Sequence, residues 1–325
     1  MRTLSRSVVA VSTMALASAG LALGAGSASA ALTTYCDGDA ADVTVPGDLV
    51  VAAGDACMLT GVTVEGEVRV QAGADLLTTG TTIAERVVVQ ADAYFDAVST
   101  EVGGNVISNG GYGVYLDEST VDGSYQGRAG EGAEPFLYSY DSAIEGRLNA
   151  AQGLVHLETV TVGGHVTSEN TLYTDIIDST LSRDLTLTGN TEGVAVCASE
   201  VDGAVTATGN TGVQLGTGGG IIGCEGGNYF GSDVTVSDST GGVDVSDNIV
   251  RGDLTGEGND PAPTGTDNRV RGEAGGQFAD LAPAAQTMTA SATSQDRAEQ
   301  LDDQRTERRG AAEEAIEESG PATLR

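Results

Sequence analysis

The hydrophobic positions of this chain follow a repeat of about 20 residues, the length of a single supersecondary unit. Each repeat carries a five-residue signature whose first and fifth residues are apolar and whose third is glycine or polar, as in Val64-Glu-Gly-Glu-Val68. The signatures begin at Val45, Val64, Ile83, Val102, Val121, Ile144, Val162, Leu181, Val201, Phe230, Val250 and Val270, the last ending at Ala274. A fixed period of this length predicts stacked units, none of which can bury its apolar side chains alone.

Around the signatures, apolar and polar residues alternate in steps of two, for example over residues 64–70. Such alternation with many β-branched residues is typical of short strands. Glycine and asparagine lie between these runs, as at Gly189-Asn190, where tight bends are expected. The pattern predicts an all-β fold, a single-stranded parallel β-solenoid (β-helix) of about twelve coils. Because parallel crossovers are generally right-handed, we expect right-handed coiling.

Two features of the repeat predict surface structure. The intervals from Val121 to Ile144 and from Val201 to Phe230 are longer than all the others, so each should contain an inserted loop. The residue before the signature should face outward, and it is threonine in six coils. These residues are Thr44, Thr63, Thr82, Thr120, Thr161 and Thr180.

The four cysteines form an even set, for which three pairings are possible. The separation of Cys36 and Cys57 is close to one coil, and Cys197 and Cys224 lie on either side of most of the second insertion. Residues one coil apart should lie directly above one another, at a spacing that a disulfide can span. We therefore favour the disulfides Cys36–Cys57 and Cys197–Cys224.

The N-terminal segment, from Met1 to Ala30, has the plan of a secretory signal peptide. Arg2 and Arg6 precede an apolar stretch over residues 7–26, and Ala28-Ser29-Ala30 offers a cleavage site. An uncleaved membrane anchor is the alternative. The pattern predicts a secreted protein that has no membrane contact after cleavage, and this segment resembles the signal peptides of actinobacteria.

Charge narrows the range of partners. The net charge is −32, and all fifteen basic residues are arginine. A surface this acidic repels nucleic acid and anionic membranes, so we expect neither as a partner.

The repeat stops at Gly275, residues 277–293 show no periodicity, and residues 294–319 are charge-dense, with Leu301 and Ile316 almost their only large apolar side chains. We expect this tail to bury no core and to be disordered or partly helical. The expected organisation is a signal peptide (1–30), a β-solenoid with an N-terminal cap (31–275) and a low-complexity charged tail (276–325).

Tyr115, Tyr138 and His156 each occupy the middle, outward position of a short in-out-in triplet in successive coils, and Tyr173 follows in a similar triplet. The repeat predicts that these four residues form one exposed column. Aromatic rings spaced along a rod suit the stacking of sugar rings, but tyrosine ladders also occur without any ligand. Both interpretations, a polysaccharide-binding face and a structural ladder, stay open.

Candidates for other chemistry are few. Asp37, Asp39 and Asp42 place three carboxylates in one glycine-containing loop, a candidate calcium site that lacks the twelve-residue plan of an EF-hand. Surface acidity is the preferred interpretation of this loop, and we expect no cofactor. His165 occupies an outward signature position, so we interpret it as a surface residue.

The coil style resembles that of pectate lyases and polygalacturonases, which would imply cleavage of acidic polysaccharides. Their motifs are not matched, because the chain has no lysine and its one Asp-Asp pair, Asp302-Asp303, lies in the tail. The Val-x-Gly-x-Val cadence is also similar to bactofilins, cytoskeletal β-helices that polymerise end to end and lack signal peptides.

We therefore expect a non-enzymatic secreted structural or adhesive solenoid that contacts polysaccharide or a cell-wall surface. The alternative is a divergent polysaccharide lyase or hydrolase of the β-helix type. The sequence leaves the oligomeric state open.

Overall fold

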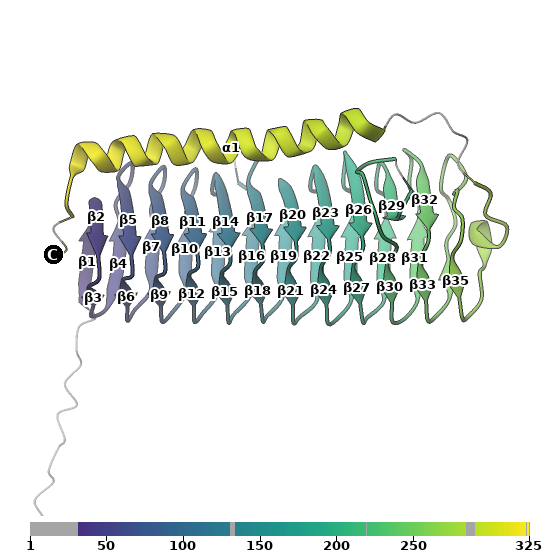
Figure 1. The fold of residues 1–325 in the computed structure, drawn as a ribbon, viewed down its shortest axis with the longest axis horizontal. Coiled ribbons are helices and arrows are strands. Elements are labelled where there is room, and N and C mark those ends of the chain that lie inside the picture. Colours follow the sequence, from purple (N-terminus) through teal and green to yellow (C-terminus); the bar gives the residue numbers. More distant parts are fainter. Residues whose placement is uncertain (1–31, 131–133, 219, 284–289, 323, 325) are drawn as a thin grey trace, which may run out of the picture. The chain divides into compact units, whose positions relative to one another are not determined.

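Three parallel sheets form the body of the protein (Figure 1). The structure is a computed structural model that describes residues 32–130, 134–218, 220–283, 290–322 and 324. The expected signal peptide therefore lies outside the described residues. The coils number about twelve, and each adds one strand to each sheet in most of the stack, which confirms the all-β parallel solenoid.

Apart from the first, the strands of sheet A begin at or beside the fifth residue of a signature, and in most of them the side chains alternate between buried and more exposed positions as predicted. In spatial order its strands are β1 (Thr33–Cys36), β4 (Asp48–Val51), β7 (Val68–Val70), β10 (Val87–Val89), β13 (Val106–Asn109), β16 (Tyr125–Arg128), β19 (Leu148–Ala151), β22 (Val166–Glu169), β25 (Leu185–Thr188), β28 (Val205–Thr208), β31 (Val234–Ser237) and β34 (Leu254–Thr255).

Sheet B contains the next strand of each coil, and most of its strands are buried on both faces. In spatial order its strands are β2 (Gly38–Ala41), β5 (Ala56–Thr60), β8 (Asp75–Thr79), β11 (Tyr94–Val98), β14 (Gly113–Asp117), β17 (Phe136–Tyr140), β20 (Leu154–Glu158), β23 (Tyr173–Ile177), β26 (Gly193–Cys197), β29 (Val213–Gly216) and β32 (Val243–Ser246).

Sheet C contains two-residue strands that end on the first residue of each signature, which is buried in all coils but the last. In spatial order its strands are β3 (Thr44–Val45), β6 (Thr63–Val64), β9 (Thr82–Ile83), β12 (Glu101–Val102), β15 (Thr120–Val121), β18 (Ala143–Ile144), β21 (Thr161–Val162), β24 (Thr180–Leu181), β27 (Glu200–Val201), β30 (Tyr229–Phe230), β33 (Ile249–Val250) and β35 (Arg269–Val270). The predicted threonines face outward here; Thr120 is half-buried and the other five are exposed.

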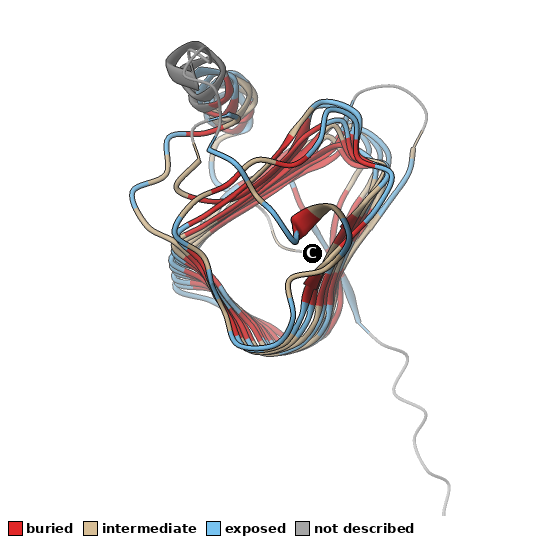
Figure 2. Cartoon of the chain, turned by 90° about the vertical axis from the view of Figure 1, so that its right-hand side faces the viewer, coloured by how far each residue is buried: buried red, intermediate tan, exposed pale blue. Residues whose placement is uncertain are grey.

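The inward side chains of the three sheets form one apolar core along the stack. Figure 2 shows the buried residues, in red, along the walls of the coil. Between sheets B and C, the coils also stack buried polar side chains, and many of these accept a hydrogen bond from the backbone N–H of the neighbouring coil. Examples are Ser199, which accepts from Ser179 N, and Asn248, which accepts from Asn228 N. These ladders satisfy buried polar groups and keep the coils in register.

Both predicted disulfides are present, Cys36–Cys57 and Cys197–Cys224, each with its Cα atoms 5.7 Å apart. The two longer intervals correspond to loops between β16 and β17 and between β29 and β30, as the repeat predicts. At the far end of the stack, the 3₁₀ helix η1 (Gly276–Phe278) places Phe278 against the core.

The tail is partly helical, one of the two states expected for it, and its helix packs on the solenoid. A 30-residue helix, α1 (Ala290–Ser319), runs beside sheet B from the later coils back to the first (Figures 1 and 2). At 1.5 Å per residue it is about 45 Å long, close to nine strand spacings of about 4.8 Å. The expectation that the tail buries no core is wrong, because α1 buries Leu301, Ala312 and Ile316 against sheet B.

After α1 the chain pairs with the first strand of sheet B. Asp39 N donates to Gly320 O over 3.0 Å, and Ala322 N donates to Asp39 O over 2.6 Å. The tail thus protects an edge strand that would otherwise offer free hydrogen-bonding groups. Within the described chain, α1 included, no helix has an apolar stretch long enough to cross a membrane.

Candidate functional site

The outer face of sheet B is the surface on which the candidate binding residues gather. In β11, Phe95 and Ala97 face the core, while Tyr94 and Asp96 face outward and are equally inaccessible to solvent. Parallel strands buried on both faces need a cover on each side. Over much of sheet B, that outer cover is α1.

The predicted column is partly correct in register and wrong in exposure. Tyr115 pairs with Tyr138, and Tyr138 with His156, as expected. The next partner of His156 is Asp175, because Tyr173 is two residues earlier in β23 and lies in the neighbouring column. None of the four predicted residues is exposed: Tyr138 and Tyr173 are 1% and 0% accessible, because α1 lies over them.

The helix is held by arginines that meet carboxylates on the sheet. The most buried pair joins Arg297 Nη1 to Asp175 Oδ1 over 2.6 Å, with side chains 6% and 2% exposed. Arg297 also donates to Glu192 O over 2.6 Å, and its guanidinium lies 4.4 Å from the centre of the Tyr173 ring. Burial raises the pKa of Asp175, and the neighbouring guanidinium offsets only part of that effect.

Three more arginines follow along α1 at spacings that place them on the side facing the sheet. Arg308 Nε lies 2.7 Å from Asp75 Oδ1, and Arg309 Nη1 lies 2.9 Å from Asp96 Oδ1. The guanidinium of Arg305 lies 3.7 Å from the centre of the Tyr115 ring. The helix is therefore positioned by charge and by ring contacts as well as by its few apolar side chains.

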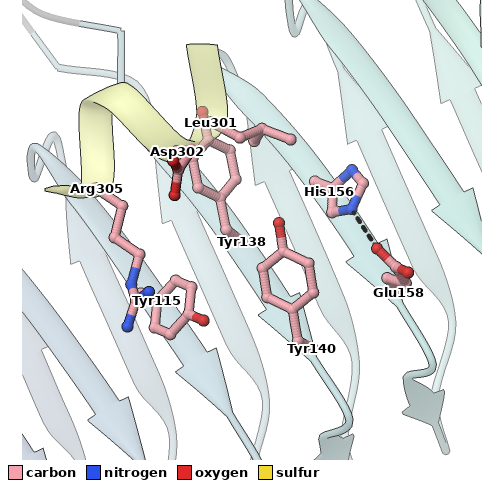
Figure 3. Close-up of a pocket in the computed structure, with 8 residues that line it drawn as sticks. All are labelled: Tyr115, Tyr138, Tyr140, His156, Glu158, Leu301, Asp302 and Arg305. Carbon is pink, nitrogen blue, oxygen red and sulfur yellow. Dashed lines mark hydrogen bonds and ion pairs between the residues drawn. The ribbon is translucent and has the colours of Figure 1, made fainter. Parts of the chain in front are cut away.

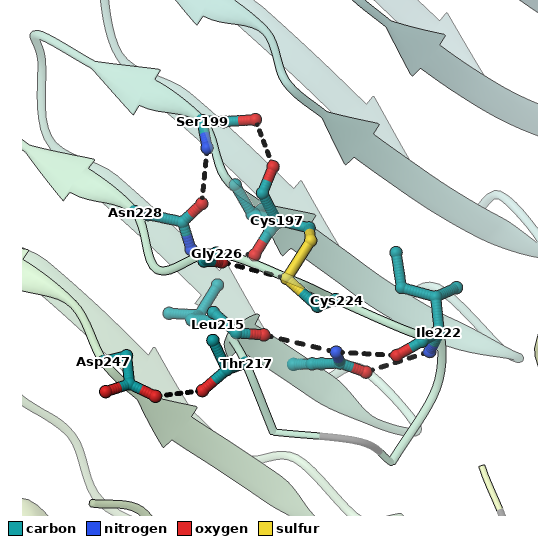
Figure 4. Close-up of a disulfide and its surroundings, with 12 residues drawn as sticks. Cys197, Ser199, Leu215, Thr217, Ile222, Cys224, Gly226, Asn228 and Asp247 are labelled. Atoms are coloured by element: carbon teal, nitrogen blue, oxygen red, sulfur yellow. Dashed lines mark hydrogen bonds between the residues drawn. A yellow bond between two sulfur atoms is a disulfide. The ribbon is translucent and has the colours of Figure 1, made fainter. Parts of the chain in front are cut away.

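A second cover protects sheet B in the later coils (Figure 4). The inserted loop between β29 and β30 buries Ile222 against Ala195, and Cys224 fixes the loop to Cys197 of β26. Gln214 of β29 holds the loop backbone: its Oε1 accepts from Ile222 N over 2.9 Å, and its Nε2 donates to Ile222 O over 3.0 Å.

Beside α1, a pocket of about 230 Å³ opens over β14, β17 and β20 (Figure 3). Its lining residues come from those three strands and one turn of the helix. They are Tyr115, Tyr138, Tyr140, His156, Glu158, Leu301, Asp302 and Arg305. Asp302 is exposed and the Glu158 side chain is 46% exposed, so the pocket reaches solvent on their side.

Hydrogen bonds fix the polar groups of this pocket. Tyr138 OH donates to Gln304 Oε1 of α1 over 2.7 Å. His156 Nε2 lies 3.3 Å from Glu158 Oε2, and this bond lowers the pKa of Glu158. Burial raises the pKa of Tyr115 to about 12 and also raises that of Tyr140. At neutral pH these two tyrosines are therefore neutral, and neither phenol is suited to act as a base.

The other candidates lie apart from this pocket. Asp37, Asp39 and Asp42 do not come together as a metal site, and no cluster of three or more His, Cys, Asp or Glu side chains suited to a metal occurs among the described residues. His165 is a half-exposed surface residue with Nδ1 3.2 Å from Asp184 Oδ2.

The sequence interpretation missed Tyr140, Glu158, Asp302 and Arg305. The first two could have been found, since they lie two residues beyond Tyr138 and His156 and therefore face the same side. For Asp302 and Arg305, no sequence pattern indicated that they would lie beside these strands.

Comparison with known proteins adds no family to this description. No protein-family model, no curated protein and no solved structure matches the chain.

Proposed function

We propose that this protein is a non-enzymatic secreted rod, structural or adhesive, that contacts polysaccharide or a cell-wall surface through the pocket beside α1. The observation that carries this proposal is the pocket itself. Three tyrosines line it, of which Tyr115 and Tyr138 are buried and Tyr140 is partly exposed, and two carboxylates stand at its solvent side. Tyrosine rings stack on sugars, and carboxylates accept hydrogen bonds from sugar hydroxyls.

The repeat predicted an exposed column of aromatic residues as the binding face, but α1 covers much of this face. A sugar chain cannot lie along all four predicted residues, because Tyr138 and Tyr173 are buried under the helix. Contact is therefore restricted to a short segment or a chain end at the pocket. Two disulfides support an extracellular location, because such bonds persist in oxidising compartments.

The test is retention on a panel of insoluble polysaccharides, with the supernatant analysed for cleavage products. We expect retention without products, and loss of retention in Tyr140→Ala. Tyr35→Ala is the matched control, because Tyr35 is 55% exposed on β1 at the first coil. Retention that survives Tyr140→Ala would contradict a role for the pocket, and near-ultraviolet circular dichroism would show whether that variant keeps its fold.

The alternative function is a divergent polysaccharide lyase or hydrolase. The observation that favours it is the His156–Glu158 pair, which places a potential proton carrier next to a carboxylate inside the same pocket. New reducing ends or unsaturated uronates, formed by the wild type and lost in Glu158→Gln, would establish this alternative.

A further inference from the structure

The charges of the pocket restrict what it can bind. Glu158 and Asp302 are its two carboxylates, and Arg305 is the one guanidinium among its lining residues. That guanidinium lies over the Tyr115 ring, and its Nε is 3.6 Å from Asp96 Oδ2, an ion-pair distance at which this nitrogen makes no hydrogen bond. The solvent side of the pocket is therefore negative, in a chain of net charge −32. Such a field attracts cations and repels anions.

His156 supplies a second and independent observation. Its side chain points from β20 toward the helix side of the sheet and is only 9% exposed (Figure 3). Because Nε2 faces the Glu158 carboxylate, Nε2 carries the proton in the neutral ring and Nδ1 holds a free lone pair. This buried Nδ1 has no hydrogen-bond partner among the described residues. A buried acceptor of this kind calls for a donor, such as an N–H or O–H group of a ligand.

The tyrosines of the pocket suit a cation as well as a sugar ring. Tyr140 lies between Tyr115 and His156, with ring centres 5.7 and 5.3 Å away. Their phenols are neutral at physiological pH, so the rings present ordinary π faces, which attract ammonium groups. Tyr115 already binds a guanidinium in this way, and the Tyr140 ring is the neighbouring face.

We propose that the pocket binds the protonated amino group of an amine-bearing sugar, as found in a glucosamine polysaccharide. This inference rests on the proposed function and names its ligand class. Glu158 and Asp302 would accept hydrogen bonds from the ammonium group, His156 Nδ1 would accept from a neighbouring hydroxyl or N–H, and the Tyr140 ring would stack on the sugar. Polysaccharides of uronic acids are disfavoured by the same charges.

The test compares three soluble probes by titration calorimetry with the full chain. Glucosamine oligomers carry a positive charge on each protonated amino group, N-acetylglucosamine oligomers of equal length are uncharged, and galacturonate oligomers carry a negative charge on each carboxylate. We expect glucosamine oligomers to bind at least about tenfold more tightly than the N-acetylated ones, the range of one charge-assisted hydrogen bond. Glu158→Gln and Asp302→Asn should each weaken glucosamine binding several-fold. Glu145→Gln, an exposed acid at a signature turn, is the matched control and should leave it unchanged.

The outcomes separate this inference from the proposed function. Equal affinity for the glucosamine and N-acetylated oligomers, or preference for galacturonate, with Tyr140-dependent retention would overturn the amine assignment and leave the polysaccharide contact standing. Glucosamine binding that is unchanged in both Glu158→Gln and Asp302→Asn would place the ligand elsewhere and also overturn it. Binding of no probe, together with no retention on any polysaccharide, would overturn both.

Discussion

Sheet B has two covers on its outer face, and they are held in different ways. The loop between β29 and β30 is fixed by the Cys197–Cys224 disulfide and by Gln214 of the adjacent strand. The helix α1 contains no cysteine and has no disulfide to the solenoid, and its Arg297 is paired with Asp175, a residue 122 positions away. One cover is local and cross-linked, whereas the other comes from the end of the chain and depends on side-chain matching.

The difference shows what positions α1. Its large apolar contacts, Leu301 and Ile316, are few, and its arginines meet carboxylates that are already buried in the sheet. Burying an ion pair contributes little net stability, but removing one partner is costly because the other charge stays buried. The arginines therefore set where the helix lies more than how strongly the whole chain is folded, and the loop, being cross-linked, has no such dependence.

Arg297→Ala should have the largest effect. It leaves Asp175 without its partner in a site that is 2% exposed, which costs about 3–5 kcal/mol. We expect α1 to detach locally while the solenoid stays folded, so hydrogen exchange in the helix should accelerate strongly and exchange in sheets A and C should not. The exposed Arg269→Ala is the control. Unchanged protection of α1 in Arg297→Ala would show that the ion pair does not hold the helix.

Replacing Cys197 and Cys224 together by serine should have the next largest effect. Opening this loop removes a constraint worth about 2–4 kcal/mol in the unfolded chain. We expect a lower midpoint in urea, with unchanged exchange protection of α1, because the two covers are separate. Loss of protection in α1 as well would mean that the covers act as one unit.

Tyr138→Phe tests a single contact between sheet and helix. The variant keeps the ring and removes the hydroxyl that donates to Gln304 Oε1. A lost hydrogen bond of this kind costs about 1 kcal/mol. Urea denaturation should resolve a destabilisation of that size, and an unaltered midpoint would indicate that Gln304 finds another partner at no cost.

Glu158→Gln should have the smallest effect on stability, and one that depends on pH. The bond from His156 lowers the pKa of Glu158 below its ordinary value of 4.5, so its contribution is present above that value and is lost as the pH falls through the lowered pKa. Since nearly half of the side chain is exposed, the contribution is below about 1 kcal/mol. The difference in Tm between wild type and variant should shrink on acidification, and a constant or growing difference would contradict the assignment.

The solenoid could be predicted because its information is local and repeated. The two apolar signature positions, occupied in one coil by Val64 and Val68, recur in almost every coil. Because their spacing along the sequence equals the length of one coil, it indicates which residues stack on one another. The repeat also allowed both disulfides to be predicted, because the distance between neighbouring coils limits which cysteines can form a bond.

The docking of α1 could not be predicted from the repeat. Arg297 and Asp175 are charged residues in distant parts of the chain, and nothing in either segment specifies the other. One signal was present: β11 and β23 carry apolar residues at both alternating positions, which indicates strands covered on both faces. A buried carboxylate needs a partner of opposite charge, so Asp96 and Asp175 also indicate that the element covering these strands has cationic side chains.

Tyrosine labelling with mass-spectrometric readout tests most directly whether α1 covers the outer face of sheet B. The chain contains its own references, Tyr35 at 55% exposure and Tyr125 of the inner core at 2%. The structure predicts that Tyr138 and Tyr173 react as slowly as Tyr125 in the full chain, and that both approach the rate of Tyr35 in Arg297→Ala. Labelling of Tyr138 and Tyr173 at the rate of Tyr35 in the wild type, with Tyr125 still protected, would contradict the covered face.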